Sequence, residues 1–277
     1  SRSHDAVVPL ILLDSNLQAN SQNAKNLTDQ LYRSDNIFLK LLQRVMLGFG
    51  GVSALNELGY NIDIYHLNEG HAVFAFIAKA RGLADNEIEK LKSKFFYTCH
   101  TPVEAGHDRF FFDDLDKVLK KEDTDIMERF GKERPGLANL TLLSMNISSA
   151  MNAVSHNHQK VMHIQFPKYK DRIQYVTNGV HPYTWMSQKF KELFEKFPAT
   201  FPDFKTNPMI LSKASELKAD ADFRAQLWQA HQSNKTDLCK FLEKWKLDKN
   251  LFTICWARRV AAYKRPSLIL HDISRLA

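Results

Sequence analysis

Strand-like and helix-like segments alternate along this chain, and this alternation restricts the folds open to it more than any other feature. Short runs rich in β-branched and aromatic residues predict strands at 7–13, 61–65, 95–98, 173–176 and 251–255. Apolar residues at helical spacing predict helices at 36–47, 72–81 and 140–161, and a largely helical region at 187–246 that a proline-bearing stretch at 198–208 interrupts. Such alternation predicts an α/β fold, with a parallel sheet covered by helices on both faces.

Polar side chains follow four of the predicted strands, at the point where each strand ends. The segments are 66–71, 99–102, 177–181 and 258–265. Ligands of open α/β sheets bind beyond the carboxyl ends of the strands. We therefore expect a functional site at this edge, with His100 facing a ligand and with His107 and Asp108 bracing the loop that follows it.

A cluster of cations follows the last predicted strand. It consists of Arg258, Arg259, Lys264 and Arg265, with Tyr263 among them. Arginine matches phosphate oxygens with paired donors, and helix N-termini favour anions. The cluster predicts a phosphate site rather than a salt-bridged patch.

Two further motifs have competing interpretations. His66, His71 and His100 leave a metal site open, although their spacing fits no helical zinc motif, and hydrogen bonding to sugar hydroxyls or a core position for His66 are the alternatives. The string LGFGG at 47–51 lacks the ending of a phosphate-binding loop and follows a helical pattern. We predict a turn between two helices there.

Charge and glycine usage divide the chain near residue 180. Acidic and basic residues are equal in number before that point, so the net charge of +7 lies entirely in 180–277, and all 10 glycines precede Val180. We expect two parts, 1–179 and 180–277. The basic part has no nucleic-acid motif, so no nucleic-acid partner is expected.

Cysteine usage and hydropathy suggest a location. The three cysteines are scattered and match no disulfide or zinc pattern, which favours a reducing, cytoplasmic setting. No uncharged apolar stretch is long enough to span a bilayer, and residues 7–13 lack a signal-cleavage site. We expect no membrane association.

Six strings, in order along the chain, resemble those of the α-glucan phosphorylases, the glycogen, starch and maltodextrin phosphorylase family, in its shorter bacterial and archaeal type. They are VPLILLD at 8–14, LGFGG at 47–51, HLNEGHA at 66–72, HTPVEAGHD at 100–108, VTNGVH at 176–181 with Trp185, and ARRVAAYKR at 257–265. The resemblance implies a two-domain glycosyltransferase-B architecture with Rossmann-like halves. Residues 1–179 would be the later part of the first half, and 180–277 the inter-domain helices and the start of the second.

The resemblance also implies an activity and a role for each matching residue. Such enzymes use phosphate to release glucose 1-phosphate from α-1,4-glucans, with the 5′-phosphate of pyridoxal phosphate as acid–base partner. His100 would bind the glucosyl unit and stabilise the transition state through its carbonyl, Asn178 would bind the primary hydroxyl, and Glu69 and His71 would border the sugar. Arg259 and Lys264 would hold the attacking phosphate, with Arg258 and Tyr263 beside the paired phosphates.

This sequence departs from the family pattern in several places. Gln43-Arg44 stands where the family usually has Gln-Glu, which would break a buried ion pair, and Ala153 and Gln159 replace glycines. The family's upstream glycine-rich loop, its Schiff-base lysine in a Gly-Thr-Ser-x-Met-Lys-like segment and the neighbouring glutamate have no counterpart here. We expect a central fragment, truncated at both ends, that is inactive alone and binds no cofactor covalently.

Glucan, phosphate and glucose 1-phosphate are therefore the expected ligands, with a second copy or a complementing chain as a further partner. Two other functions stay open: a non-catalytic glucan-binding remnant, and a glycosyltransferase of the same architecture that uses a nucleotide sugar.

Overall fold

The computed structural model describes residues 8–31, 36–258, 260 and 262–276. The chain divides into two compact units, Ser1–Asn178 and Gly179–Ala277.

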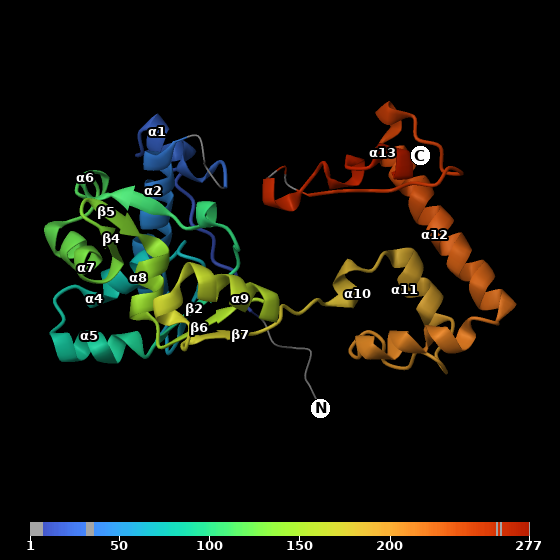
Figure 1. The fold of residues 1–277 in the computed structure, drawn as a ribbon, viewed down its shortest axis with the longest axis horizontal. Coiled ribbons are helices and arrows are strands. Elements are labelled where there is room, and N and C mark those ends of the chain that lie inside the picture. The colour runs from blue at the N-terminus through green and yellow to red at the C-terminus, as the bar shows by residue number, and fades with distance from the viewer. Residues whose placement is uncertain (1–7, 32–35, 259, 261, 277) are drawn as a thin grey trace. The chain divides into compact units, whose positions relative to one another are not determined.

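A four-stranded parallel sheet forms the centre of the first unit (Figure 1). Its order is β1-β2-β6-β7, with β1 at Tyr65–Asn68, β2 at Phe95–Cys99, β6 at Ala150–Ala153 and β7 at Ile173–Tyr175. All three strand pairs are parallel, and helices lie in every connection between them. The predicted α/β class is confirmed.

Three helices of this unit precede β1, and the others lie in the connections between the strands of the parallel sheet. They are α1 Gln22–Lys25, α2 Ile37–Val45, α3 Gly51–Glu57, α4 Phe74–Ala80, α5 Asp85–Lys92, α6 Phe112–Leu115, α7 Lys121–Gly131, α8 Leu140–Ile147 and α9 His156–Gln165. Side chains of Asn36, Asn139 and Ser155 cap the N-termini of α2, α8 and α9. A small antiparallel sheet, β3-β5-β4, which the sequence did not predict, lies between β2 and α8 in the chain; its strands are β3 Arg109–Phe111, β4 Lys132–Arg134 and β5 Leu137–Asn139.

Aromatic side chains dominate the core of this unit. Phe76 meets the ring of Phe95 edge-on at 5.2 Å and that of Phe130 at 6.1 Å between centroids. Phe76 and Phe95 are fully buried, and each such side chain contributes about 1.5–3 kcal/mol by leaving water. This contact joins α4 and α7 to the sheet.

The single helix predicted over 140–161 is wrong. The chain forms α8, then strand β6, then α9, and β6 pairs with both β2 and β7. The apolar residues of 147–154 fit a buried strand as well as a helix, because a strand buried on both faces shows no alternation. Pairing with its neighbours makes this segment a strand.

The predicted helix end at Gly48 is also wrong. Helix α2 passes into a π-helical turn, η2 at Met46–Gly50, and continues as α3. A Cβ on Gly48 would lie 2.5 Å from the Cβ of Phe74, so the glycine allows α4 to approach the π turn closely. The LGFGG string is therefore a helix contact, not an inter-helix turn.

Two predicted strands are not formed. The described residues of 7–13 and all of 251–255 are irregular, and none pairs with another described strand. β-Rich sequence becomes a strand only where a neighbour completes its backbone hydrogen bonds.

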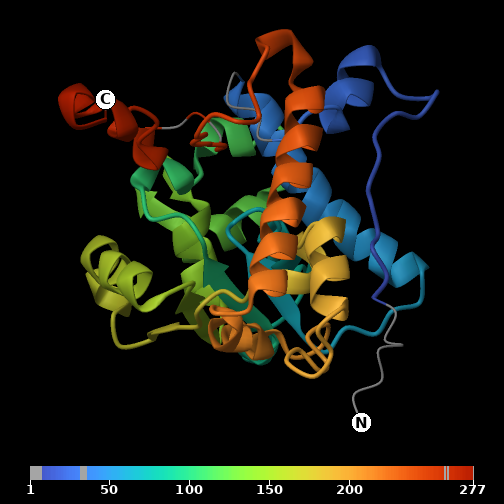
Figure 2. The same ribbon diagram turned by 90° about the vertical axis from the view of Figure 1, so that its right-hand side faces the viewer.

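The second unit is mainly helical. It contains α10 Pro182–Trp185, α11 Gln188–Glu195, a 3₁₀ segment at Pro208–Leu217, α12 Ala221–Phe241 and α13 Ile273–Leu276. Figure 2 shows α11 and α12 side by side. Its core is small and aromatic, formed by Leu193, Phe201, Phe204 and Phe223.

The continuous helix Ile37–Glu57 is long and apolar enough to cross a membrane by length and composition alone. This is weak evidence, because core helices of soluble proteins pass the same test. Its buried residues include Leu41 and Arg44, and the latter is paired with Asp108 of the same unit.

We predict that Gly48→Ala lowers the free energy of unfolding by about 1–3 kcal/mol, because the new methyl group would overlap Phe74 and the backbone nitrogen of Ala75. Gly51→Ala is the matched control: nothing lies within 4 Å of its Cβ position, and alanine is the better helix former. Urea unfolding would measure both, and equal midpoints for the two variants would contradict the close contact.

Candidate active site

The carboxyl ends of the four parallel strands lie at one edge of the sheet and bring the predicted residues of the first unit toward it. Glu69 directly follows β1 and His100 directly follows β2. Beyond β7, backbone N–H groups of Val176 and Asn178 donate to carbonyl oxygens of Ala153 and Val154, so the ladder continues to Asn178. The side chain of Asn178 is exposed there.

The carboxylate of Glu69 joins the ends of β1 and β2. Its Oε1 accepts the backbone N–H of His100 at 2.6 Å, and its Oε2 accepts the hydroxyl of Tyr97 at 3.4 Å. Glu69 is buried and has a φ of 59°, an uncommon conformation for a non-glycine residue. Both oxygens thus act on β2, and Glu69 fixes the position of His100.

A chain of polar contacts links β1, β2 and β6 close to this edge. The hydroxyl of Thr98 donates to Oδ1 of Asn152 at 2.8 Å, and Nε2 of His66 lies 2.7 Å from the same hydroxyl. Because the hydroxyl proton is used toward Asn152, His66 is the donor in the second contact. His66 is exposed, so the alternative of a core histidine is wrong.

The metal interpretation of these histidines finds no support in the structure. Among the described residues, no group of three or more histidine, cysteine, aspartate or glutamate side chains is placed to hold a metal ion.

The arginine that departs from the family pattern forms a buried ion pair rather than breaking one. Nε of Arg44 lies 2.8 Å from Oδ2 of Asp108, and Lys40 contacts Oδ1. Arg44 and Asp108 are 7% and 8% exposed. Burial alone would raise the pKa of Asp108, but the charges of Arg44 and Lys40 outweigh it and hold the pKa below its usual value.

His71 lies half-buried beside this ion pair. Burial lowers its pKa, and the charge of Arg44 lowers it further; together they outweigh Asp108 and Glu69, which act in the opposite direction. Burial and the charge of Arg44 therefore both favour the neutral imidazole of His71.

A cavity of about 700 Å³ lies between helix α2 with its π turn and the N-terminal segment. Its polar lining residues are Asp14, Asn16, Thr28, Asp29, Gln30, Gln43, Arg44 and His71, and its apolar wall is mainly leucine. Gln43 holds the segment in place, since its Nε2 donates to the carbonyls of Leu27 and Gln30. Apolar walls with a few polar groups are typical of small-molecule sites.

Sequence reasoning missed most of this cavity lining. It included His71 but gave no role to Gln43, Arg44, Asp14 or Asn16. The signals were present, because Asp14 ends the first matching string and Arg44 is a departure from the family pattern.

The thiol of Cys99, next to His100, is buried and stays protonated, which disfavours a role as a nucleophile. Burial raises the pKa of its thiol to about 12, and the thiol lies 4.0 Å from Nε2 of His158.

The predicted phosphate residues belong to the second unit. Arg258 is exposed, and its Nη1 donates to the carbonyl of Ala257. Nζ of Lys264 lies 4.7 Å from the ring centroid of Tyr263. Arg259 lies outside the described residues.

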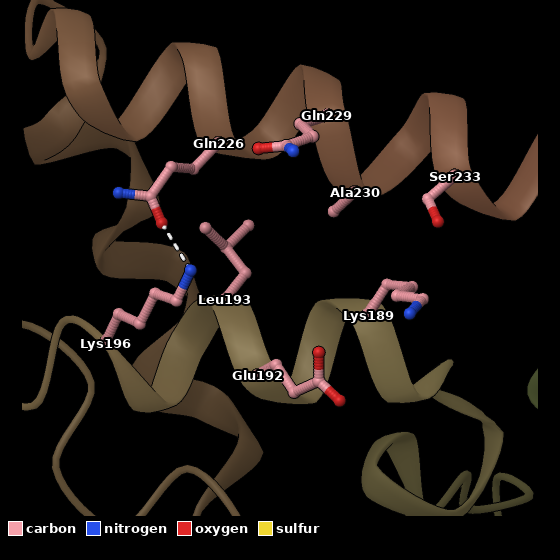
Figure 3. A pocket seen from close by; sticks show the side chains of 8 residues that line it. All are labelled: Lys189, Glu192, Leu193, Lys196, Gln226, Gln229, Ala230 and Ser233. Carbon is pink, nitrogen blue, oxygen red and sulfur yellow. Dashed lines mark hydrogen bonds between the residues drawn. The ribbon is translucent and has the colours of Figure 1, made fainter.

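A groove of about 220 Å³ lies between α11 and α12 (Figure 3). Lys196 donates to Gln226 across it at 3.1 Å, and the other polar side chains, among them Lys189 and Glu192, do not converge on one point. The groove is therefore a weaker candidate for a ligand site than the cavity of about 700 Å³ in the first unit.

Comparison with known proteins agrees with the motifs. A family model described as carbohydrate phosphorylase matches residues 94–276. The chain is 30% identical to maltodextrin phosphorylase of Thermococcus litoralis, in an alignment covering 97% of this chain and 36% of that protein. It is 29% identical to glycogen phosphorylase of Aquifex aeolicus (96% and 44%) and 28% identical to that of Mycobacterium tuberculosis (97% and 36%). The chain spans less than half the length of these relatives.

We predict that the free energy of unfolding falls as the pH is lowered from 7.5 to 5.5. Burial is the main cause that lowers the pKa values of His71, His107 and His158 in the folded state. The unfolded chain therefore takes up protons near 6.5 before the folded chain does, and stability is lost below that pH.

Urea unfolding at the two pH values measures this dependence. His107→Gln should reduce it, whereas His156→Gln, a change at an exposed position, should not. A protein that is more stable at pH 5.5 than at pH 7.5 would contradict the prediction.

Proposed function

Because this chain belongs to the carbohydrate phosphorylase family, we propose that it forms part of an α-1,4-glucan phosphorylase, which cleaves maltodextrin or glycogen with phosphate to give glucose 1-phosphate. The observation that carries this proposal is the sheet edge at which Glu69 holds the backbone of His100. The relatives are named as maltodextrin and glycogen phosphorylases, which does not favour a nucleotide-sugar enzyme. Arg44, which departs from the family pattern, is paired with Asp108, so this departure does not favour a non-catalytic remnant.

His100 is the proposed glucosyl-binding residue. Glu69 and the β2 ladder fix its backbone, and no hydrogen bond to its carbonyl oxygen is found among the described residues. A fixed carbonyl dipole stabilises positive charge that develops on a sugar ring in the transition state, because it needs no reorganisation. Asn178, exposed at the same edge, is the proposed partner of the primary hydroxyl, and Glu69 and His71 border the sugar.

The phosphate side of the reaction is assigned to the cations of residues 258–264. Arg259 and Lys264 hold the attacking phosphate, and Arg258 and Tyr263 lie near the paired phosphates. Holding the attacking phosphate in a fixed position supplies much of the rate enhancement in a bimolecular reaction.

Carbohydrate phosphorylases use pyridoxal phosphate, whose 5′-phosphate supplies an acid–base partner for the substrate phosphate. The described residues of 251–276 do not fit a covalent site for it: their one lysine, Lys264, lies over Tyr263, and neither side chain is buried. We therefore derive no step through the cofactor, and we propose that its lysine belongs to a different segment or to a complementing chain.

We also propose that the protein acts in the cytoplasm, as a homo-oligomer or with a complementing chain, without nucleic acid or membrane partners. Its three cysteines are free, and Cys99 is buried, which is consistent with a reducing compartment.

Titration calorimetry with maltoheptaose tests the sugar side. We predict that Asn178→Ala weakens binding about tenfold, the loss expected when a hydrogen bond worth about 1.4 kcal/mol is removed. Asn56→Ala, at an exposed position in α3, is the matched control. Unchanged affinity in Asn178→Ala would remove Asn178 from the site.

Phosphorolysis by the natural full-length protein tests the phosphate side. We predict that Lys264→Ala lowers kcat/KM for phosphate about a hundredfold, because one charged donor to the reacting group is lost. Lys240→Ala, at an exposed position in α12, should have no such effect. Unchanged kcat/KM in Lys264→Ala would remove Lys264 from the phosphate site.

A further inference from the structure

Arg44 connects helix α2 to the segment 100–108, which follows β2 and begins with His100. Its Nε lies 2.8 Å from Oδ2 of Asp108, 64 residues away in sequence. Lys40, one helical turn earlier, contacts the other oxygen of the same carboxylate. Both oxygens of Asp108 are therefore held by α2.

The same segment is attached at other points by hydrogen bonds that are not ion pairs. Glu69 accepts the N–H of His100, and Gln165 donates to the carbonyl of Pro102 at 3.2 Å. Nδ1 of His107 lies 3.0 Å from the hydroxyl of Thr141. Among the described residues, the ion pairs of this segment are those of Asp108 with Lys40 and Arg44 of α2.

Arg44 also acts on His71 across the wall of the cavity. Both side chains line it, and the charged groups that act on His71 are Lys40 and Arg44 of α2, Asp108 of the 100–108 segment, and Glu69. The two cations oppose a positive charge on His71, whereas the two carboxylates favour it.

We propose that Arg44 is a positioning residue of the candidate sugar site: it holds the 100–108 segment against α2 through Asp108, and it sets a positive charge in the cavity wall that His71 also lines. The inference rests on the proposed function only in treating the cavity as part of a sugar site. A neutral imidazole has one donor and one acceptor, whereas a charged one has two donors. Sugar hydroxyls, which both donate and accept, match the neutral form.

The test is an NMR titration of the imidazole of His71 between pH 5 and 8, with its signals assigned by comparison with His71→Gln. Arg44→Met should raise the pKa of His71, because a repelling charge is removed. Asp108→Asn should lower it, because an attracting charge is removed. Both variants should unfold at lower urea concentration than the wild type.

The opposite signs separate this role from a purely structural one. Loosened packing alone would expose His71 in both variants and move its pKa upward in both, toward the value in water. Arg81→Met is the matched control: it breaks a buried-carboxylate pair with Asp123 elsewhere in the same unit, so it should destabilise the fold without moving His71.

Shifts of the same sign, or no shift, would overturn the proposal. If Arg44→Met does not fold, Arg44→Lys keeps the charge, and its His71 should titrate like that of the wild type; a clear rise would equally overturn the proposal. Calorimetry at pH 7 should show maltoheptaose binding about tenfold weaker in Arg44→Met. Opposite pKa shifts in a wild-type protein that binds no maltoheptaose would refute the sugar site while leaving the coupling of Arg44 and His71 in place.

Discussion

Parallel hydrogen bonding between four strands is the constraint on which the first unit depends. Parallel strands require crossover connections, so helices lie between successive strands and cover the sheet. The same arrangement brings every carboxyl end to one edge. Glu69 and His100, 31 residues apart, meet there in a 2.6 Å hydrogen bond because β1 and β2 are neighbours in the ladder.

Two buried carboxylates hold the elements at this edge together. Glu69 ties β1 to β2, and Asp108 ties the segment after β2 to helix α2. A buried ion pair contributes little net stability, since desolvation offsets the attraction, but loss of one partner is costly. The pair of Arg44 and Asp108 is therefore better understood as a determinant of position and charge than as a source of stability.

The second unit depends on a different interaction, the packing of aromatic rings from α11, α12 and the segment between them. Phe194 meets Phe201 at 4.9 Å, and Phe197 meets Phe223 at 5.1 Å between ring centroids. Several lysines of this part, among them Lys189 and Lys240, lie on the helices α11 and α12. Its excess charge is consistent with the proposed handling of phosphate and with an ordinary solvated surface.

The sequence by itself determined the α/β class, the positions of β2, β7, α2 and α4 to within a few residues, and the family, because short-range periodicity and fixed motifs carry that information. It misassigned 140–161, since apolar residues at 147–154 become a strand only between β2 and β7. The sequence also predicted a helix end at Gly48, but the helix continues there, and the missing side chain allows Phe74 to approach closely. Only the tertiary structure decided that Arg44 pairs with Asp108. The two residues are 64 positions apart, so the fold and not the local sequence brings their charges together.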